Sequence, residues 1–176
     1  MMARLITRLR LRRWIFFGLI CFLSLPVYPQ LKLASIFGDG MVLQRSQPIS
    51  VWGWEKPGER ISVSLRDQVE VVVADAAGQW AVKLDAEAAG GPYVLLVKGT
   101  KTIALKDVLI GDVWLCAGQS NMQFTVSKVQ NSANEIANAK YSNIRHFKIQ
   151  NAESILPVSA LPRGKWQVCS PKTDGG

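Results

Sequence analysis

The sequence predicts a mixed fold, with an N-terminal antiparallel β-sandwich followed by the first part of an α/β domain. Between residues 31 and 106, runs of about five residues alternate between apolar and polar side chains, with turn residues at spacings of roughly 8–12. After residue 106 the apolar character becomes nearly continuous, which is typical of a strand covered on both faces by helices. We therefore expect three segments, at 1–30, 31–106 and 107–176.

Residues 1–30 have the form of an export signal. An apolar stretch at 14–25 is followed by Pro26, and it suits a signal peptide better than the roughly twenty residues that span a bilayer. Five arginines and no acidic residue precede this stretch: Arg4, Arg8, Arg10, Arg12 and Arg13. No clean Ala-x-Ala cleavage site lies between residues 25 and 30, so an uncleaved N-terminal anchor is the alternative. We expect a secreted or periplasmic protein that meets the membrane only transiently, through this segment.

The sandwich prediction depends on six short runs, which Gly, Pro, Asp and Lys turn residues separate. These runs lie at 49–54, 61–65, 69–73, 80–84, 93–97 and 102–105. No amphipathic helix of useful length interrupts them. The region therefore reads as one antiparallel sandwich.

Aromatic residues of this region offer a second functional interpretation. A carbohydrate-binding sandwich module without catalysis would use Trp52, Trp54, Trp80 and Tyr93 as a platform for sugar rings. Aromatic side chains also dominate the cores of such sandwiches, so we expect core or inter-domain packing for these four residues.

The pattern after residue 106 predicts strand, helix and strand in succession. Residues 108–116 form the nearly continuous apolar run, and Ser132 with Glu135 has the spacing of a capping box before a short helix. Residues 144–149 alternate and predict the next strand. One such unit cannot bury its own apolar strands, so we expect this domain to be incomplete.

Charge and cysteine content exclude some classes of function. The formal charge is +8, but without the five N-terminal arginines sixteen Lys and Arg stand against thirteen Asp and Glu. These sixteen are scattered, which argues against nucleic acid as a partner. Cys21 belongs to the signal segment, so Cys116 and Cys169 remain, either as a disulfide or as small buried side chains.

A candidate nucleophile stands at the end of the apolar run, in Gly118-Gln119-Ser120-Asn121-Met122. A turn from a strand into a helix lifts a serine hydroxyl above the sheet edge and directs backbone N–H groups toward developing negative charge. Such a serine also needs a base. His146 is the one histidine of the sequence, and we expect a structural or surface role for it. Ser120 also fits an ordinary turn or helix cap.

Two separated blocks of the sequence resemble the sialate O-acetylesterases. One comprises residues 33–45 with 48–54 and 57–59, and the other comprises 111–122; residues 166–171 are also similar. The resemblance implies a carbohydrate esterase of the SGNH type with a flavodoxin-like hydrolase domain and no metal or cofactor. Its substrate would be an O-acetylated glycan or sialic acid, with acetylxylan as an alternative.

The resemblance also implies that Ser120 is the nucleophile and that its own backbone N–H donates to the oxyanion. The family's Asp-x-x-His block and its oxyanion glycine and asparagine blocks are not found in these 176 residues, and Asn143 stands three residues before His146. The sequence is therefore expected to be an inactive N-terminal portion of an esterase. A truncated product that does not accumulate is a further alternative.

Overall fold

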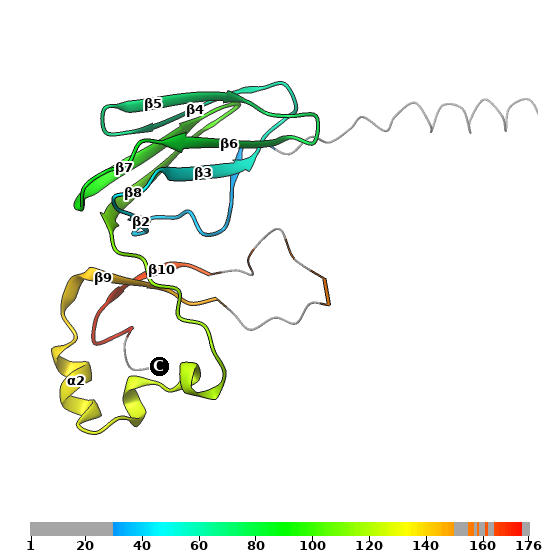
Figure 1. Ribbon diagram of the computed structural model, residues 1–176. Coiled ribbons are helices and arrows are strands. Elements are labelled where there is room, and N and C mark those ends of the chain that lie inside the picture. The colour runs from blue at the N-terminus through cyan, green and yellow to red at the C-terminus, as the bar shows by residue number, and fades with distance from the viewer. Residues whose placement is uncertain (1–29, 150–154, 157, 159–160, 162–163, 174–176) are drawn as a thin grey trace, which may run out of the picture.

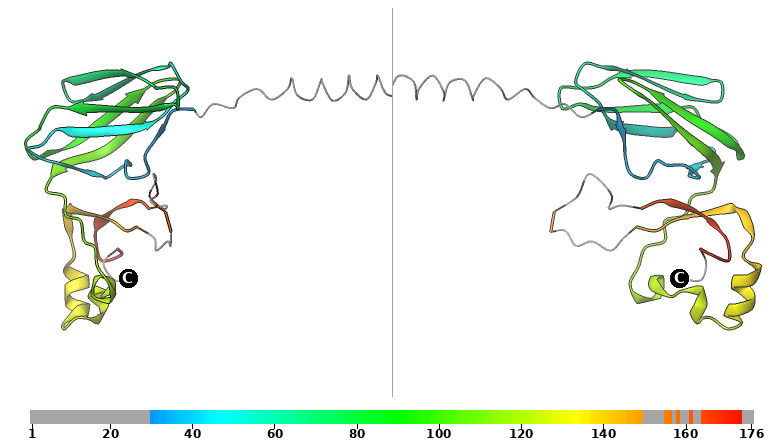
Figure 2. Two further views of the ribbon diagram at one scale, coloured as in Figure 1. Left: turned by 45° about the vertical axis from the view of Figure 1, so that its right-hand side comes forward. Right: turned by 180° about the vertical axis from the view of Figure 1, so that it is seen from behind.

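The computed structural model describes residues 30–149, 155–156, 158, 161 and 164–173. The predicted export signal lies outside the described residues. The described chain forms two sheets that pack together, and below them a smaller unit with short helices and a two-stranded ribbon (Figures 1 and 2).

Two sheets build the N-terminal region. The smaller sheet is antiparallel, with the order β1 (Lys32–Leu33), β3 (Ile49–Trp54) and β6 (Gln79–Leu84). The larger sheet follows the order β2 (Val42–Gln44), β8 (Thr102–Gly111), β7 (Gly90–Lys98), β4 (Arg60–Leu65) and β5 (Gln68–Val73). Its pairs are antiparallel except β2 with β8, which is parallel. The region is mostly β, as predicted, but its larger sheet is mixed and not purely antiparallel.

The core lies between the two sheets and follows the period of two in their sequences. Val51, Val63 and Leu95 are fully buried, whereas the residues next to them in β3 and β4 face outward or are half-buried. Gly53 is required where β1 pairs with β3, because a Cβ there would lie 2.1 Å from the backbone oxygen of Lys32. Trp80 packs close to the same glycine and is only 4% exposed.

Of the four aromatic residues for which we expect core or inter-domain packing, the pair on β3 lies outside the sandwich core. Trp80 is buried and Tyr93 packs against the core, as expected. Trp52 is 40% exposed and Trp54 is half-buried, because both occupy the outward positions of β3. A three-stranded sheet has an outer face, and this face carries the two tryptophans.

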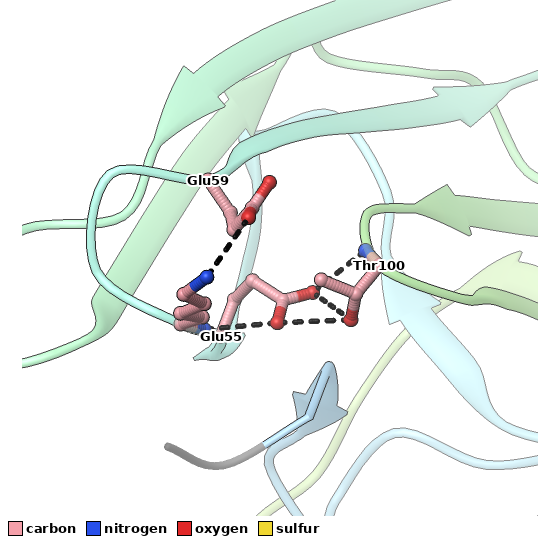
Figure 3. Close-up of polar contacts among 4 residues, drawn as sticks. Glu55, Glu59 and Thr100 are labelled. Carbon is pink, nitrogen blue, oxygen red and sulfur yellow. Dashed lines mark hydrogen bonds and ion pairs between the residues drawn. The ribbon is translucent and has the colours of Figure 1, made fainter. Parts of the chain in front are cut away.

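One buried acid fastens two turns of the sandwich together. Glu55, directly after β3, is fully buried, and it is the one buried polar or charged residue among the described residues. Its carboxylate accepts from the backbone N–H of Lys56 at 2.8 Å and from that of Thr100 at 3.0 Å, and also from the Thr100 hydroxyl (Figure 3). It thereby joins the β3–β4 turn to the β7–β8 turn.

The predicted buried strand at 108–116 is wrong in its second half. β8 ends at Gly111, and Trp114 and Leu115 beyond it are 84% and 87% exposed. Val108 and Ile110 instead face the sandwich core. The physical reason is that no helix of the described residues covers this run, so its first half completes the larger sheet. The boundary between 106 and 107 falls within β8 and stays a prediction.

The smaller unit contains the predicted helix and strand but pairs its strands differently. It comprises η1 (Ser120–Gln123), η2 (Val126–Lys128), α2 (Ser132–Asn138), β9 (Tyr141–Phe147) and β10 (Trp166–Cys169). β9 pairs antiparallel with β10, and the described residues contain no parallel β-α-β unit. Asn131 in the left-handed region precedes α2 with no side-chain cap, so the predicted capping box is not formed.

Candidate active site

The segment that carries Ser120 leaves the sandwich from a firmly held point. The backbone N–H of Arg45 donates to the carbonyl of Gly111 at 2.9 Å, and that of Val113 donates to Oε1 of Gln44 at 2.8 Å. Arg45 also binds Asp112, with 2.8 Å between Nε and Oδ1. This hydrogen bond and the opposite charge raise the pKa of Arg45 above its ordinary value. The end of β2 therefore fixes residues 111–113.

Ser120 lies on the surface, at the start of a short 3-10 helix. The carbonyl of Gln119 accepts from the N–H of Met122 at 2.9 Å and closes the turn. Gly118 lets the Met122 side chain pack close to this turn, because a Cβ there would lie 2.6 Å from Cγ of Met122 and would force that side chain to move. The sequence prediction of a tight turn is confirmed, but an irregular exposed segment precedes it and not a buried strand.

The turn leaves donors available beside the hydroxyl. Within the described part of the chain, the backbone N–H groups of Ser120 and Asn121 donate to no acceptor, and the Ser120 hydroxyl makes no hydrogen bond. Backbone N–H groups at the start of a helical turn favour a developing negative charge. In the described part of the chain, these two N–H groups are therefore available to an acceptor from outside the turn.

No base reaches Ser120 in the described part of the structure. His146 lies half-buried on β9, opposite Gln167 of β10, and makes no hydrogen bond with Ser120. Asn143 lies on the same strand. This position agrees with the structural or surface role that the sequence predicts for His146.

The acids near the predicted strands have structural partners. Asp39 accepts from the backbone N–H of Lys106 at 2.7 Å, and Asp112 binds Arg45. Asp107 forms an ion pair of 3.0 Å with Arg145, whose side chain is only 6% exposed. This pair joins β9 to β8 and was not predicted from the sequence, because the two residues are distant along the chain.

Further contacts hold the smaller unit against the loop after β1. Nε1 of Trp166 donates to the carbonyl of Ile36 at 2.7 Å, and the Ser35 hydroxyl donates to the carbonyl of Leu161 at 3.1 Å. No disulfide bond joins Cys116 and Cys169, and the alternative of two buried side chains holds for Cys169 but is wrong for Cys116, which is exposed. Over the described residues, every helix is too short or too polar to span a membrane.

Comparisons with known proteins identify clear relatives, although no family model matches the chain. It is 36% identical over 136 residues to the sialate O-acetylesterase of Mus musculus, covering 70% of this chain and 25% of that protein. Identity to the sialate O-acetylesterase of Homo sapiens is 37% over 142 residues, covering 73% and 26%. A carbohydrate acetylesterase from Xanthomonas citri has a similar structure, with a TM-score of 0.81 and 42% identity over 82% of this chain and 34% of that one. The chain thus spans about a quarter of the length of the curated relatives.

Proposed function

Because the chain is a homologue of the sialate O-acetylesterases over about 70% of its length, we propose that it carries the nucleophile segment of a carbohydrate O-acetylesterase. One observation carries the proposal: Ser120 is exposed, makes no hydrogen bond in the described part, and lies beside two free backbone donors. The substrate class is an O-acetylated sugar, with sialic acid as the first choice.

The reaction assigns a separate role to each group. Oγ of Ser120 attacks the acetyl carbonyl, and the N–H of Ser120, with that of Asn121, stabilises the negative oxygen of the tetrahedral intermediate. A base takes the hydroxyl proton and passes it to the departing sugar oxygen. Water then releases acetate from the serine ester. None of these steps requires a metal or a cofactor.

The base is the part that these 176 residues do not supply. They contain no Asp-x-x-His block, and His146 makes no hydrogen bond with Ser120. We expect residues 107–176 to act as the first part of a flavodoxin-like SGNH domain in which a base approaches Ser120. Exposed apolar residues on the same segment, Trp114 and Leu115, support packing against further polypeptide. Without a base, the chain alone should hydrolyse the ester about 10⁶-fold more slowly than an enzyme with a complete triad.

Location is part of the same proposal. The export signal expected at residues 1–30 would place the protein in the periplasm or outside the cell, where O-acetylated glycans are accessible. A fusion of residues 1–30 to a reporter enzyme that acts only after export would test this directly, with the five arginines changed to glutamate as the control.

A chimera tests the nucleophile more sharply than the chain alone. Residues 31–173 would replace the matching part of the Xanthomonas citri carbohydrate acetylesterase, to which they are similar in structure. The chimera should release acetate from an O-acetylated sugar, and Ser120→Ala should abolish the release. Ser127→Ala, an exposed serine on η2, is the matched control and should leave the rate unchanged. An active Ser120→Ala chimera would refute the assignment.

A further inference from the structure

The outer face of the smaller sheet carries an arrangement that the proposed esterase chemistry does not use. Alternation along β3 directs Ser50, Trp52 and Trp54 outward. The strand pairing places Lys32 of β1 and Gln79 of β6 beside Trp54, Ala81 beside Trp52, and Lys83 beside Ser50. In Figure 1, β3 and β6 form the side of the sandwich opposite the larger sheet.

Trp52 is the central residue of this face and packs against a neighbouring aromatic ring. Phe37 meets its ring edge to face, with 4.7 Å between the ring centroids and 77° between the planes. Ala81, on the neighbouring strand, has a side chain too short to cover the indole. The ring therefore stays 40% exposed although Phe37 packs against it. A large aromatic side chain that is exposed and packed on one side is a frequent mark of a binding surface.

Two cations flank this ring along the strand direction. The ammonium of Lys32 lies 5.8 Å from the centroid of the Trp54 ring, which holds it by a cation–π contact. Lys83 lies on the other side of Trp52, beside Ser50. Positions two residues apart on a strand are separated by about 6.5–7 Å. Lys32 pairs with Trp54 and Lys83 pairs with Ser50, so the backbone of each lysine is displaced by about that distance along the strand direction from Trp52.

The charge of this face has one sign. The outward positions of β1, β3 and β6 hold two lysines and no acid: Lys32, Ser50, Trp52, Trp54, Gln79, Ala81 and Lys83. An anionic ligand complements such a face, and a cationic one is repelled. The indole face carries negative quadrupole density, which attracts the weakly positive C–H bonds on the apolar face of a sugar ring.

We propose that this face binds saccharide chains that carry carboxylates. One sugar ring stacks on Trp52, and its carboxylate, or that of the next sugar, reaches Lys32 or Lys83. Hydroxyl groups of the sugar exchange hydrogen bonds with Gln79 and Ser50. The site is independent of Ser120, so it would retain an acidic glycan whether or not the chain takes part in ester hydrolysis.

Calorimetric titration of the full 176-residue chain tests the proposal with defined probes. Oligogalacturonate and α2,8-linked oligosialic acid are the acidic probes, and a cello-oligosaccharide of equal length is the uncharged one. We expect both acidic probes to bind and the uncharged probe to bind at least several-fold more weakly. Salt at 0.5 M should lower the affinity for the acidic probes toward that for the uncharged probe, because it screens the charge of the exposed lysines.

Variants locate the binding on this face. Trp52→Ala should weaken the acidic probes about tenfold or more, in the range found for loss of one aromatic stacking contact, and Trp52→Phe should retain part of the affinity. Lys32→Gln and Lys83→Gln should each lower the affinity for the acidic probes and leave the affinity for the uncharged probe unchanged. Tyr141→Ala, an exposed aromatic residue on β9, and Lys98→Gln, an exposed lysine on β7, are the matched controls and should bind normally.

Several results would overturn the proposal. These are the absence of binding by both acidic probes at millimolar concentration, equal binding of acidic and uncharged probes, and unchanged binding by Trp52→Ala. Sedimentation of the same variants provides a further outcome: a dimer that Trp52→Ala dissociates, without saccharide binding, would identify a second copy of the chain as the occupant. Thermal unfolding of each variant verifies that it folds, and Trp52→Phe keeps the test valid if Trp52→Ala does not.

Discussion

Replacing Glu55 by glutamine should destabilise the sandwich although the two side chains have the same shape. In the native protein both carboxylate oxygens accept: Oε1 from the N–H of Lys56, and Oε2 from the N–H of Thr100. A glutamine has one oxygen, so its amide NH₂ must face one of these two donors. Gly99 leaves little room for adjustment, because a Cβ there would lie 2.6 Å from Oε2.

The magnitude follows from the number of bonds that each variant loses. A hydrogen bond to a charged group contributes about 1.5–3 kcal/mol, and a neutral one about 0.5–1.5 kcal/mol. Glu55→Gln forfeits one charged bond and should lower the free energy of unfolding by about 2 kcal/mol. Glu55→Ala loses the bonds to all three donors and should lower the free energy of unfolding by about 3–5 kcal/mol, because water partly replaces the lost bonds at the exposed Lys56 and Thr100. Thr100→Val removes the hydroxyl but leaves the carboxylate both of its N–H donors, so it should lower the free energy of unfolding by about 1.5 kcal/mol, the lower end of the range for a bond to a charged group.

Urea unfolding followed by tryptophan fluorescence measures these differences, since buried Trp80 reports on the core. The expected order of destabilisation is Thr100→Val, then Glu55→Gln, then Glu55→Ala. A Glu55→Gln variant within about 0.5 kcal/mol of the native protein would refute the reasoning, because it would mean that the buried carboxylate is not needed as a double acceptor.

Two further predictions separate local geometry from chemistry. Gly53→Ala should lower the free energy of unfolding by at least about 2–3 kcal/mol, since its Cβ would meet the backbone of β1. Gly58 has a φ of +79° and open space around it, so Gly58→Ala should lower the free energy of unfolding by about 1 kcal/mol. Equal urea midpoints for the two variants would contradict this expectation. Ser120→Ala should change the free energy of unfolding by less than about 0.5 kcal/mol, because the exposed hydroxyl makes no hydrogen bond in the described part, and a larger loss in the same assay would indicate a structural role.

The sequence predicts β3 and β6 well because each of these strands buries one face. The runs at 49–54 and 80–84 alternate in sequence, and β3 and β6 alternate in burial over the same residues. The same alternation contains the correct placement of Trp52, since it shares its face with Ser50 and not with Val51. The sequence thus indicates that Trp52 and Trp54 share one face of β3, whereas the choice between core and inter-domain packing depends on segments that are distant along the chain.

Other features depend on residues that are distant along the chain. Glu55 reads as part of a polar turn, and only the approach of Thr100 converts it into a buried acceptor. The run at 108–116 divides because β2 returns to pair with β8 and ends with it at Gly111. The turn at Ser120 is predictable because Gly118 and Met122 are neighbours in sequence, whereas a base for that serine would come from a distant segment.

The pairing of β2 with β8 has a consequence for how such a protein can be rearranged by recombination. β8 contributes Val108 and Ile110 to the sandwich core, and residues 111–113 are bound to Gln44 and Arg45. Recombination of two related genes at residue 106 would take the first half of β8 from one parent protein and the second half, with Val108 and Ile110, from the other. Exchange of the segment that carries Ser120 should therefore succeed only when the junction falls after Val113, so the sandwich and the first residues of the nucleophile segment are inherited together.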